Sequence, residues 1–254
     1  MADVILLERR DSVQIITINR PEARNAVDLA TAQGIADAVD ELDADDDLRV
    51  GVITGAGGTF CSGMDLKAYL RGERPVIGDR GFAGITTTPP RKPLIAAGEG
   101  YALAGGVELL LACDLVVAAE TSQFGIPEVK RGLIAGGGAA MLLPRRIPAA
   151  IALELLLTGD PIGATRAAAL GLVNRVMPEG KALEGALELA AVIAANGPLA
   201  VAATKEIARR QADWTLEEGW RRQAEIYRPV FASQDAREGA LAFAEKRPPV
   251  WRGR

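Results

Sequence analysis

The chain has 254 residues, of which 49% are hydrophobic and 24% are charged, enough to bury the core of one large globular domain or of a domain with a small appendage. A net charge of -4 and a pI near 5.2 argue against the broad basic surface that nucleic-acid binding requires. The sequence contains no histidine, which excludes Ser-His and Cys-His catalysis and every histidine-based metal site. Proton transfer near neutral pH is then left to carboxylates with raised pKa values or to lysines with strongly lowered ones.

The sequence carries no visible signal for export or membrane insertion. Asp3 stands where a secretory signal needs a basic start. The longest apolar stretches, around 107–112 and 151–157, are bounded or interrupted by acidic residues and are far shorter than a membrane span. The cysteines, Cys61 and Cys113, are too few for a disulfide framework and lack metal-site spacing. We therefore expect a cytoplasmic protein with reduced cysteines.

Strands and helices alternate along the N-terminal half. Two β-rich runs, 4–7 and 13–18, are separated by polar residues and predict a hairpin. Apolar residues spaced three and four apart over 28–42 predict an amphipathic helix. Three short buried strands and one further helix continue the pattern, at 50–54, 94–97 and 115–117 for the strands and at 106–112 for the helix. The unit of strand, loop and helix therefore recurs.

The middle and the end of the chain differ from this pattern. Segment 71–92 is rich in glycine and contains Thr-Thr-Thr-Pro-Pro, which predicts a long loop with room for one helical turn. Long loops inside compact domains are often functional. Strand signals vanish from about residue 181, and helices are expected at 181–195, 198–211, 215–228 and 235–246. We divide the chain into a core, 1–195, and a helical C-terminal subdomain, 196–254.

Three glycine-bearing loops are candidates for binding. Residues 54–60 follow a strand as a dinucleotide-binding loop would, but Phe60 occupies the place of the third glycine, so a flexible turn explains them as well. Residues 60–66 open a short helical run whose N–H groups could face a cleft, and a plain turn is an equal alternative. In 100–109, two glycines start a helix whose unpaired N–H groups favour developing negative charge.

Two acids are candidates for proton transfer. Glu108 lies near a helix start, where a glutamate usually complements the helix dipole on a solvated face, but its neighbours are apolar and weaken that explanation. Glu128 follows a proline, and Pro-Glu can simply open a helical turn. Cys61 has no histidine partner, so a small buried residue is a better interpretation than a nucleophile. Taken singly, each of these residues has a structural explanation.

Taken together, the motifs resemble those of the crotonase (enoyl-CoA hydratase/isomerase) family in order and spacing along nearly the whole chain. The segments that carry the resemblance are NRPEARNA (19–26), FCSGMDL (60–66), KPLIAA (92–97), GYALAGGVEL (100–109), FGIPEV (124–129) and GLVN (171–174). Several motifs in register are far more specific than any one of them.

The resemblance implies an α/β fold, in which repeated β-β-α units form a spiral of two roughly perpendicular sheets followed by a helical trimerisation region. It implies an acyl-CoA thioester as the substrate, with coenzyme A as part of that substrate and no separate cofactor or metal. It also implies further copies of the chain as partners, in a homotrimer or a dimer of trimers.

The resemblance further implies the roles of four residues. Family members bind the thioester oxygen through two backbone N–H groups, whose positions correspond to Met64 and Gly105. Members commonly carry a small residue where Met64 stands, a difference that bears on the shape of the acyl pocket because only the N–H is needed. The two glutamates of the hydratases correspond to Glu108, assigned to the water, and Glu128, assigned to the α-proton.

The contacts with CoA are implied less strongly. The matching positions are Arg24, Ser62, Asp65 and Leu66, with Phe243 and Lys246 supplied by a neighbouring subunit. Exposed basic side chains mostly face solvent, so a structural explanation competes for these positions. Ser62 and Leu66 would act through backbone groups.

We therefore expect an enoyl-CoA hydratase, a hydro-lyase that adds water reversibly to a 2-enoyl-CoA thioester. Residues 242–254 together with 143–150 are similar to the carnitinyl-CoA dehydratase branch, which would keep the same reaction type. Double-bond isomerisation, in which Glu108 or Glu128 alone shuttles a proton, is a second alternative. A catalytically silent acyl-CoA-binding subunit is a third, because fold does not fix function.

Overall fold

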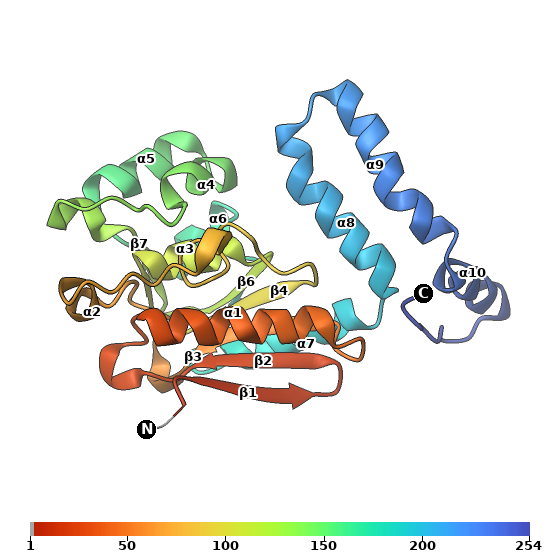
Figure 1. The fold of residues 1–254 in the computed structure, drawn as a ribbon, viewed down its shortest axis with the longest axis horizontal. Helices are drawn as coiled ribbons and strands as arrows, with labels where there is room; N and C mark the ends of the chain where they lie inside the picture. Colours follow the sequence, from red (N-terminus) through yellow and green to blue (C-terminus); the bar gives the residue numbers. More distant parts are fainter. Residues whose placement is uncertain (1–2) are drawn as a thin grey trace.

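The computed structural model describes residues 3–254, which form a core of two β-sheets with packed helices and a helical arm that extends from this core (Figure 1). The larger sheet has six strands in the order β1-β2-β3-β4-β6-β9. Their bounds are Ile5–Arg10, Val13–Ile18, Val50–Gly55, Leu94–Gly98, Leu115–Ala119 and Arg175–Met177. The smaller sheet has three strands in the order β5-β7-β8, with bounds Tyr101–Leu103, Gln123–Gly125 and Ile162–Gly163.

The strand predictions for the larger sheet are confirmed. β1 and β2 form the expected antiparallel hairpin, with Ile5 opposite Ile18. From β2 to β9 all neighbours are parallel, so each connection is a crossover rather than a tight turn. β9 and the three strands of the smaller sheet were not predicted, because runs of two or three residues are too short to show a period.

The expected repeat of strand, strand and helix is also confirmed. After β3, Cys61 forms a bridge with Ala102, and α2 (Leu66–Leu70) follows. After β4, β5 leads into α3 (Gly105–Ala112), and after β6, β7 leads into the 3-10 helix η4 (Pro127–Arg131). Since β3, β4 and β6 are neighbours in one sheet and β5 and β7 are neighbours in the other, successive turns of the chain stack on one another.

The central strands of the larger sheet, β2, β3, β4 and β6, are buried on both faces, as their nearly continuous apolar residues require, whereas the edge strand β1 is mostly exposed. Alternate residues of the central strands pack against α7 (Ala182–Ala194), among them Val50, Val52, Ile95 and Ala97. The intervening residues, among them Ile53, Ala96 and Val116, pack on the other face in the cluster that includes α1 (Leu29–Ala44) and α3. α1 is the helix that the apolar spacing of 28–42 predicts.

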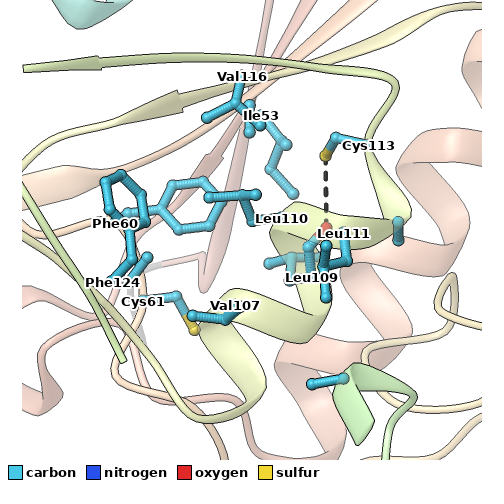
Figure 2. Close-up of a cluster of buried hydrophobic side chains, with 14 of the residues drawn as sticks. Ile53, Phe60, Cys61, Val107, Leu109, Leu110, Leu111, Cys113, Val116 and Phe124 are labelled. Atoms are coloured by element: carbon cyan, nitrogen blue, oxygen red, sulfur yellow. Dashed lines mark hydrogen bonds between the residues drawn. The ribbon is translucent and has the colours of Figure 1, made fainter. Parts of the chain in front are cut away.

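Helix α3 lies wholly inside this second cluster. All of its residues are buried, and Figure 2 shows Leu110 on the side of Phe60 and Leu109 beside Leu111. A helix that is apolar all round must be buried, and Glu108 is its one charged side chain. Cys113 follows the helix, and its Sγ donates to the Leu109 carbonyl at 3.4 Å (Figure 2). Burial raises the pKa of this thiol and of Cys61 to about 12, so neither is a nucleophile near neutral pH.

The helices of the C-terminal part agree with the prediction to within a few residues: α7, α8 (Pro198–Arg210), α9 (Leu216–Phe231) and α10 (Gln234–Glu245). α7 packs on the larger sheet, whereas α8 and α9 leave the core as an arm that carries α10 and the C-terminus (Figure 1).

The helices α4 (Ala139–Arg146), α5 (Ala149–Thr158) and α6 (Ala164–Ala169) were not predicted. Further 3-10 turns lie at Pro21–Ala23, Ala56–Gly58, Gly78–Arg80 and Gln211–Asp213. The turn at Gly78–Arg80 is the single helical turn expected within 71–92.

No single helix between residues 3 and 254 is both long and apolar enough to cross a membrane, although α7 and the stretch Pro198–Asp213 pass such a test as a pair bent by 109°.

The arm is tied to the core at the end of α3. Asp114, just beyond that helix, forms ion pairs with Lys205 at 2.6 Å and with Arg209 at 3.3 Å, and its side chain is only 15% exposed. The Arg209 guanidinium also donates to the carbonyl of Ala112 at 2.9 Å. Cations at a helix C-terminus stabilise its unpaired carbonyl groups, so the arm holds the helix that carries Glu108.

Candidate active site

A cavity of about 810 Å³ brings together residues that lie far apart in the sequence. Most of the candidate site residues line it: Arg24, Ser62, Met64, Leu66, Gly105, Glu108 and Glu128. The long segment 71–92 contributes to the wall, as expected, through Arg74, Pro75, Val76, Gly81, Phe82, Thr86 and Thr87. The candidates Asp65, Phe243 and Lys246 do not line this cavity.

The Met64 N–H group is left without an acceptor by the pairing of its neighbours. Val27 donates to the Gly63 carbonyl at 2.8 Å, and Asp65 donates to the Val27 carbonyl at 2.9 Å. In such a parallel bridge the residue between the two partners turns its own N–H away. Gly105 is the first residue of α3, so no preceding turn of the helix supplies a carbonyl acceptor for its N–H group. Within residues 3–254 neither N–H donates to a protein acceptor.

The two N–H groups lie in adjacent loops. A side chain at Gly63, where φ is +95°, would place its Cβ 2.9 Å from the Gly105 nitrogen. Ala104 adopts φ 52° and ψ -125°, a conformation that costs an L-residue roughly 1–3 kcal/mol. Its N–H donates to the Gly125 carbonyl at 2.8 Å, which helps to hold this strained turn. The strained turn therefore brings the start of α3 next to the loop that carries Gly63 and Met64.

Glu108 is almost fully buried, with 5% of its surface exposed. Its carboxylate accepts from the Ala139 N–H at 3.2 Å. Burial raises the pKa of Glu108, and backbone N–H groups of Ala139, Gly137 and Gly138 act in the opposite direction. Gly137 lies so close that a Cβ there would be 2.4 Å from the carboxylate Oε2. The loop before α4 therefore holds the carboxylate in place and partly offsets the effect of burial on its pKa.

Glu128 lies on η4 and has a less favourable environment for a charge. Its Oε2 is buried and has no hydrogen-bond partner in the described part of the chain. Burial and the nearby charge of Glu108 raise the pKa of Glu128 to about 7, although a backbone hydrogen bond and Arg131 act in the opposite direction. Both protonation states of Glu128 are therefore populated near neutral pH. Two carboxyl groups with different proton affinities facing one cavity can divide the roles of acid and base.

The N-terminal motif forms a scaffold for these loops, a role that the sequence alone did not reveal. The buried Asn25 amide donates to the carbonyl groups of Ala56 at 2.8 Å and Thr59 at 2.6 Å. Arg20 pairs with Asp65 at 3.0 Å. Asp65 also caps α2, accepting from the Ala68 N–H at 3.1 Å. Partial burial would raise the pKa of Asp65, but the Ala68 and Arg20 hydrogen bonds outweigh it and lower that pKa.

The remaining candidates for CoA contact lie in two places. Arg24 is exposed, and its backbone carbonyl accepts from the Ser62 N–H at 3.1 Å. Leu66 lines the same cavity and is 41% exposed. Phe243 is 88% exposed on α10, and Lys246 forms the C-cap of that helix, which follows α9 in the arm (Figure 1). Contacts from a neighbouring subunit therefore stay a prediction.

Two contributors to the site were missed. Phe82 stands beside Gly105, where a Cβ would lie 2.5 Å from its ring. In the glycine run 136–138, Gly137 and Gly138 direct backbone N–H groups at the Glu108 carboxylate, and three consecutive glycines before a helix were a signal that could have found this loop. Phe60, the residue that breaks the dinucleotide-type loop, is fully buried in the core. No cluster of three or more Cys, Asp or Glu side chains within residues 3–254 has the arrangement of a metal site.

Comparison with known proteins identifies the family of the chain. Residues 8–254 match the family model described as Enoyl-CoA hydratase/isomerase. The carnitinyl-CoA dehydratase of Proteus mirabilis is 42% identical, with 100% of both chains covered, and the enoyl-CoA hydratase EchA19 of Mycobacterium tuberculosis is 45% identical, covering 98% of this chain and 96% of that one. The crystal structure of enoyl-CoA hydratase EchA1 from Mycobacterium marinum superposes with a TM-score of 0.97 at 59% identity, covering 99% of this chain and 100% of the other. The chain belongs to the enoyl-CoA hydratase/isomerase family.

Proposed function

We propose that this protein is an enoyl-CoA hydratase, which adds water reversibly across the double bond of a 2-enoyl-CoA thioester. The observation that carries the proposal is that Glu108, Glu128 and the free N–H groups of Met64 and Gly105 all face one cavity. These are the groups that the reaction requires: a base for water, an acid for the α-carbon and donors for the thioester oxygen.

The N–H groups of Met64 and Gly105 donate to the thioester oxygen. This oxygen gains negative charge when the water oxygen bonds to the β-carbon and an enolate forms. Donors that are already oriented stabilise that charge without reorganising, and the positive end of the α3 dipole acts in the same direction. Apolar walls around the cavity reduce the competition from solvent.

The two carboxyl groups complete the reaction. Glu108, as the carboxylate, takes a proton from water as the C–O bond forms, and Glu128, as the acid, gives its proton to the α-carbon. The N–H groups around Glu108 favour the carboxylate, and the raised pKa of Glu128 favours the acid. Dehydration reverses these steps. The reaction involves no net oxidation or reduction, and coenzyme A enters as part of the substrate, so the proposal includes no separate cofactor or metal.

We further propose that CoA is bound by Arg24, Ser62, Asp65 and Leu66 of one chain and by Phe243 and Lys246 of a neighbouring one, in a cytoplasmic homotrimer or dimer of trimers. The Asp65 carboxylate is already bonded within the chain, so it acts by fixing the start of α2. The apolar surface of segment 196–254 supports the assembly, since Trp220 is 67% and Phe231 is 77% exposed. In this scheme segment 1–195 carries the site and segment 196–254 the contacts.

Carnitinyl-CoA dehydratase activity is the second candidate, favoured by the name of the Proteus relative. Its substrate carries a trimethylammonium cation. Aromatic faces commonly bind such cations, but the Tyr69 ring in the cavity wall is covered by the Arg74 guanidinium at 4.0 Å. Arg74 and Arg131 also add positive charge to this wall. The charge of the cavity therefore favours uncharged acyl chains.

A panel of acyl-CoA thioesters tests the proposal. Crotonyl-CoA, longer 2-enoyl-CoA thioesters and crotonobetainyl-CoA are each mixed with the enzyme, and the ultraviolet absorbance of the conjugated double bond is followed. We expect this absorbance to fall with uncharged chains and more slowly with crotonobetainyl-CoA. Conversion of 3-enoyl to 2-enoyl thioesters without hydration would identify an isomerase instead. Tight binding without any turnover would identify a silent acyl-CoA-binding subunit.

A further inference from the structure

Thr86 presents a buried hydroxyl to the cavity without a partner. The residue lines the cavity and is 9% exposed, and its Oγ1 is buried with no hydrogen-bond partner among residues 3–254. The other buried threonines differ: the Thr31 hydroxyl donates to Asp28 at 2.7 Å, and the Thr54 hydroxyl donates to the Ala97 carbonyl at 2.9 Å. A buried hydroxyl without a partner is costly, so its persistence at a cavity wall points to a ligand.

Gly81 keeps the space in front of this hydroxyl open. A Cβ at Gly81 would lie 2.6 Å from the Thr86 Oγ1 and 2.4 Å from the Thr87 Oγ1. The backbone there has φ 77° and ψ -163°, which only glycine adopts readily. Two hydroxyl oxygens therefore flank one small space beside the cavity. A hydroxyl both donates and accepts, so the pair suits an uncharged oxygen-bearing group.

This space adjoins the proposed reaction centre through Phe82, the residue after Gly81. A Cβ at Gly105 would lie 2.5 Å from the Phe82 ring. The backbone carbonyl of Phe82 accepts from the Thr86 N–H at 3.3 Å. The thioester is held at Met64 and Gly105 in the function proposed above. The wall beyond Phe82, which contains Thr86, is left for the acyl chain.

We infer that Thr86, assisted by Thr87, forms a hydrogen-bonding subsite that selects 2-enoyl chains with a hydroxyl or oxo group beyond the reacting double bond. The inference rests on the proposed hydratase function and names its substrate class. A plain alkyl chain would bury the Thr86 hydroxyl without a partner, whereas an oxygenated chain would pair with it. Sites built to bond a substrate hydroxyl discriminate against analogues that lack it.

Matched pairs of substrates test the inference. The kcat/KM for hydration is measured with 2-hexenoyl-, 2-octenoyl- and 2-decenoyl-CoA and with the same thioesters bearing a terminal hydroxyl. The native enzyme should prefer the hydroxylated member of at least one pair by about tenfold to a hundredfold, the range expected when a buried polar group gains a partner. In Thr86→Val the preference should vanish, because the plain substrates keep or gain kcat/KM while the hydroxylated ones lose it.

Three variants separate selectivity from folding. Thr86→Ser keeps the hydroxyl and should restore the preference, and Thr87→Val should reduce it partly. Thr54→Val removes a buried hydroxyl outside the cavity and should lower the melting temperature without changing the ratio. Equal kcat/KM for both members of every pair, or the same ratio in the native enzyme and Thr86→Val, would overturn the subsite. Failure to hydrate any thioester would instead refute the proposed function.

Discussion

Gly137→Ala is the sharpest test of how Glu108 is held. An alanine Cβ at this position would lie 2.4 Å from the Glu108 Oε2, 2.8 Å from its Cδ and 2.9 Å from the Phe82 Cβ. Gly137 does not have a positive φ, so alanine adds no backbone strain and the effect is purely steric. Overpacking of this kind costs about 1–3 kcal/mol, and moving the carboxylate away removes the proposed base. We expect kcat to fall by ~10²- to 10⁴-fold, the usual contribution of positioned acid-base catalysis.

Gly136→Ala is the matched control, because its Cβ would meet nothing closer than the Ile134 carbonyl at 3.9 Å. Both variants are assayed for hydration of crotonyl-CoA and for thermal unfolding, with CoA binding as a check of the fold. A Gly136→Ala enzyme close to native, beside a Gly137→Ala enzyme that binds CoA but turns over slowly, is the expected result. Equal activity in the two variants would mean that the glycine loop does not position Glu108.

Four further predictions concern the same groups. Hydration should decline as pH rises through about 7, where Glu128 loses its proton. Because the folded pKa of Glu128 is raised from 4.5 to about 7, the native protein loses stability as pH rises from about 4.5 to about 7, so Glu128→Gln should melt at a higher temperature than the native protein above pH 7. Glu108→Gln and Glu128→Gln should each lower kcat by ~10²- to 10⁴-fold, and the double variant should be little worse than the poorer single one. Gly105→Val should cost at least ~10²-fold in kcat, because the new side chain pushes against Phe82 and displaces an oxyanion donor. Deletion after residue 195 should give an inactive monomer or an aggregate by gel filtration, and a soluble, fully active monomer would contradict the proposed assembly.

Much of the fold follows from periodicity. The first five strands of the larger sheet, β1, β2, β3, β4 and β6, and the helices α1, α7, α8, α9 and α10 are long enough to repeat an apolar pattern, so their positions were predictable. The smaller sheet was not, because β5, β7 and β8 have only two or three residues each and depend on stacking against the preceding turn of the chain. α4 contains Pro144, which weakens a helical pattern even though the helix continues through it.

The candidate site was predictable only through its motifs. The positions of Glu108 and Glu128 came from the resemblance, since neither acid is distinctive alone. The contacts that shape Glu108, from Ala139 and Gly137, come from a segment about thirty positions later, and no local pattern joins the two. Phe82 illustrates the same limit, because an aromatic residue in an irregular loop gives no sign of which glycine it will cover.

Buried polar groups without partners occur both at the proposed reaction centre and at the Thr86 subsite. Folded proteins satisfy nearly all buried polar groups, so those left without partners are informative where they cluster. Some buried side-chain atoms in residues 3–254 have no hydrogen-bond partner. Those of Arg80 and Arg222 belong to guanidinium groups that pair through other nitrogens. Those of Gln14 have no structural explanation. The other two, the Glu128 Oε2 and the Thr86 Oγ1, line the same cavity as the free N–H groups of the oxyanion pair. A substrate that satisfies all of these groups at once carries a thioester oxygen, an α-carbon that accepts a proton and a further oxygen along its chain.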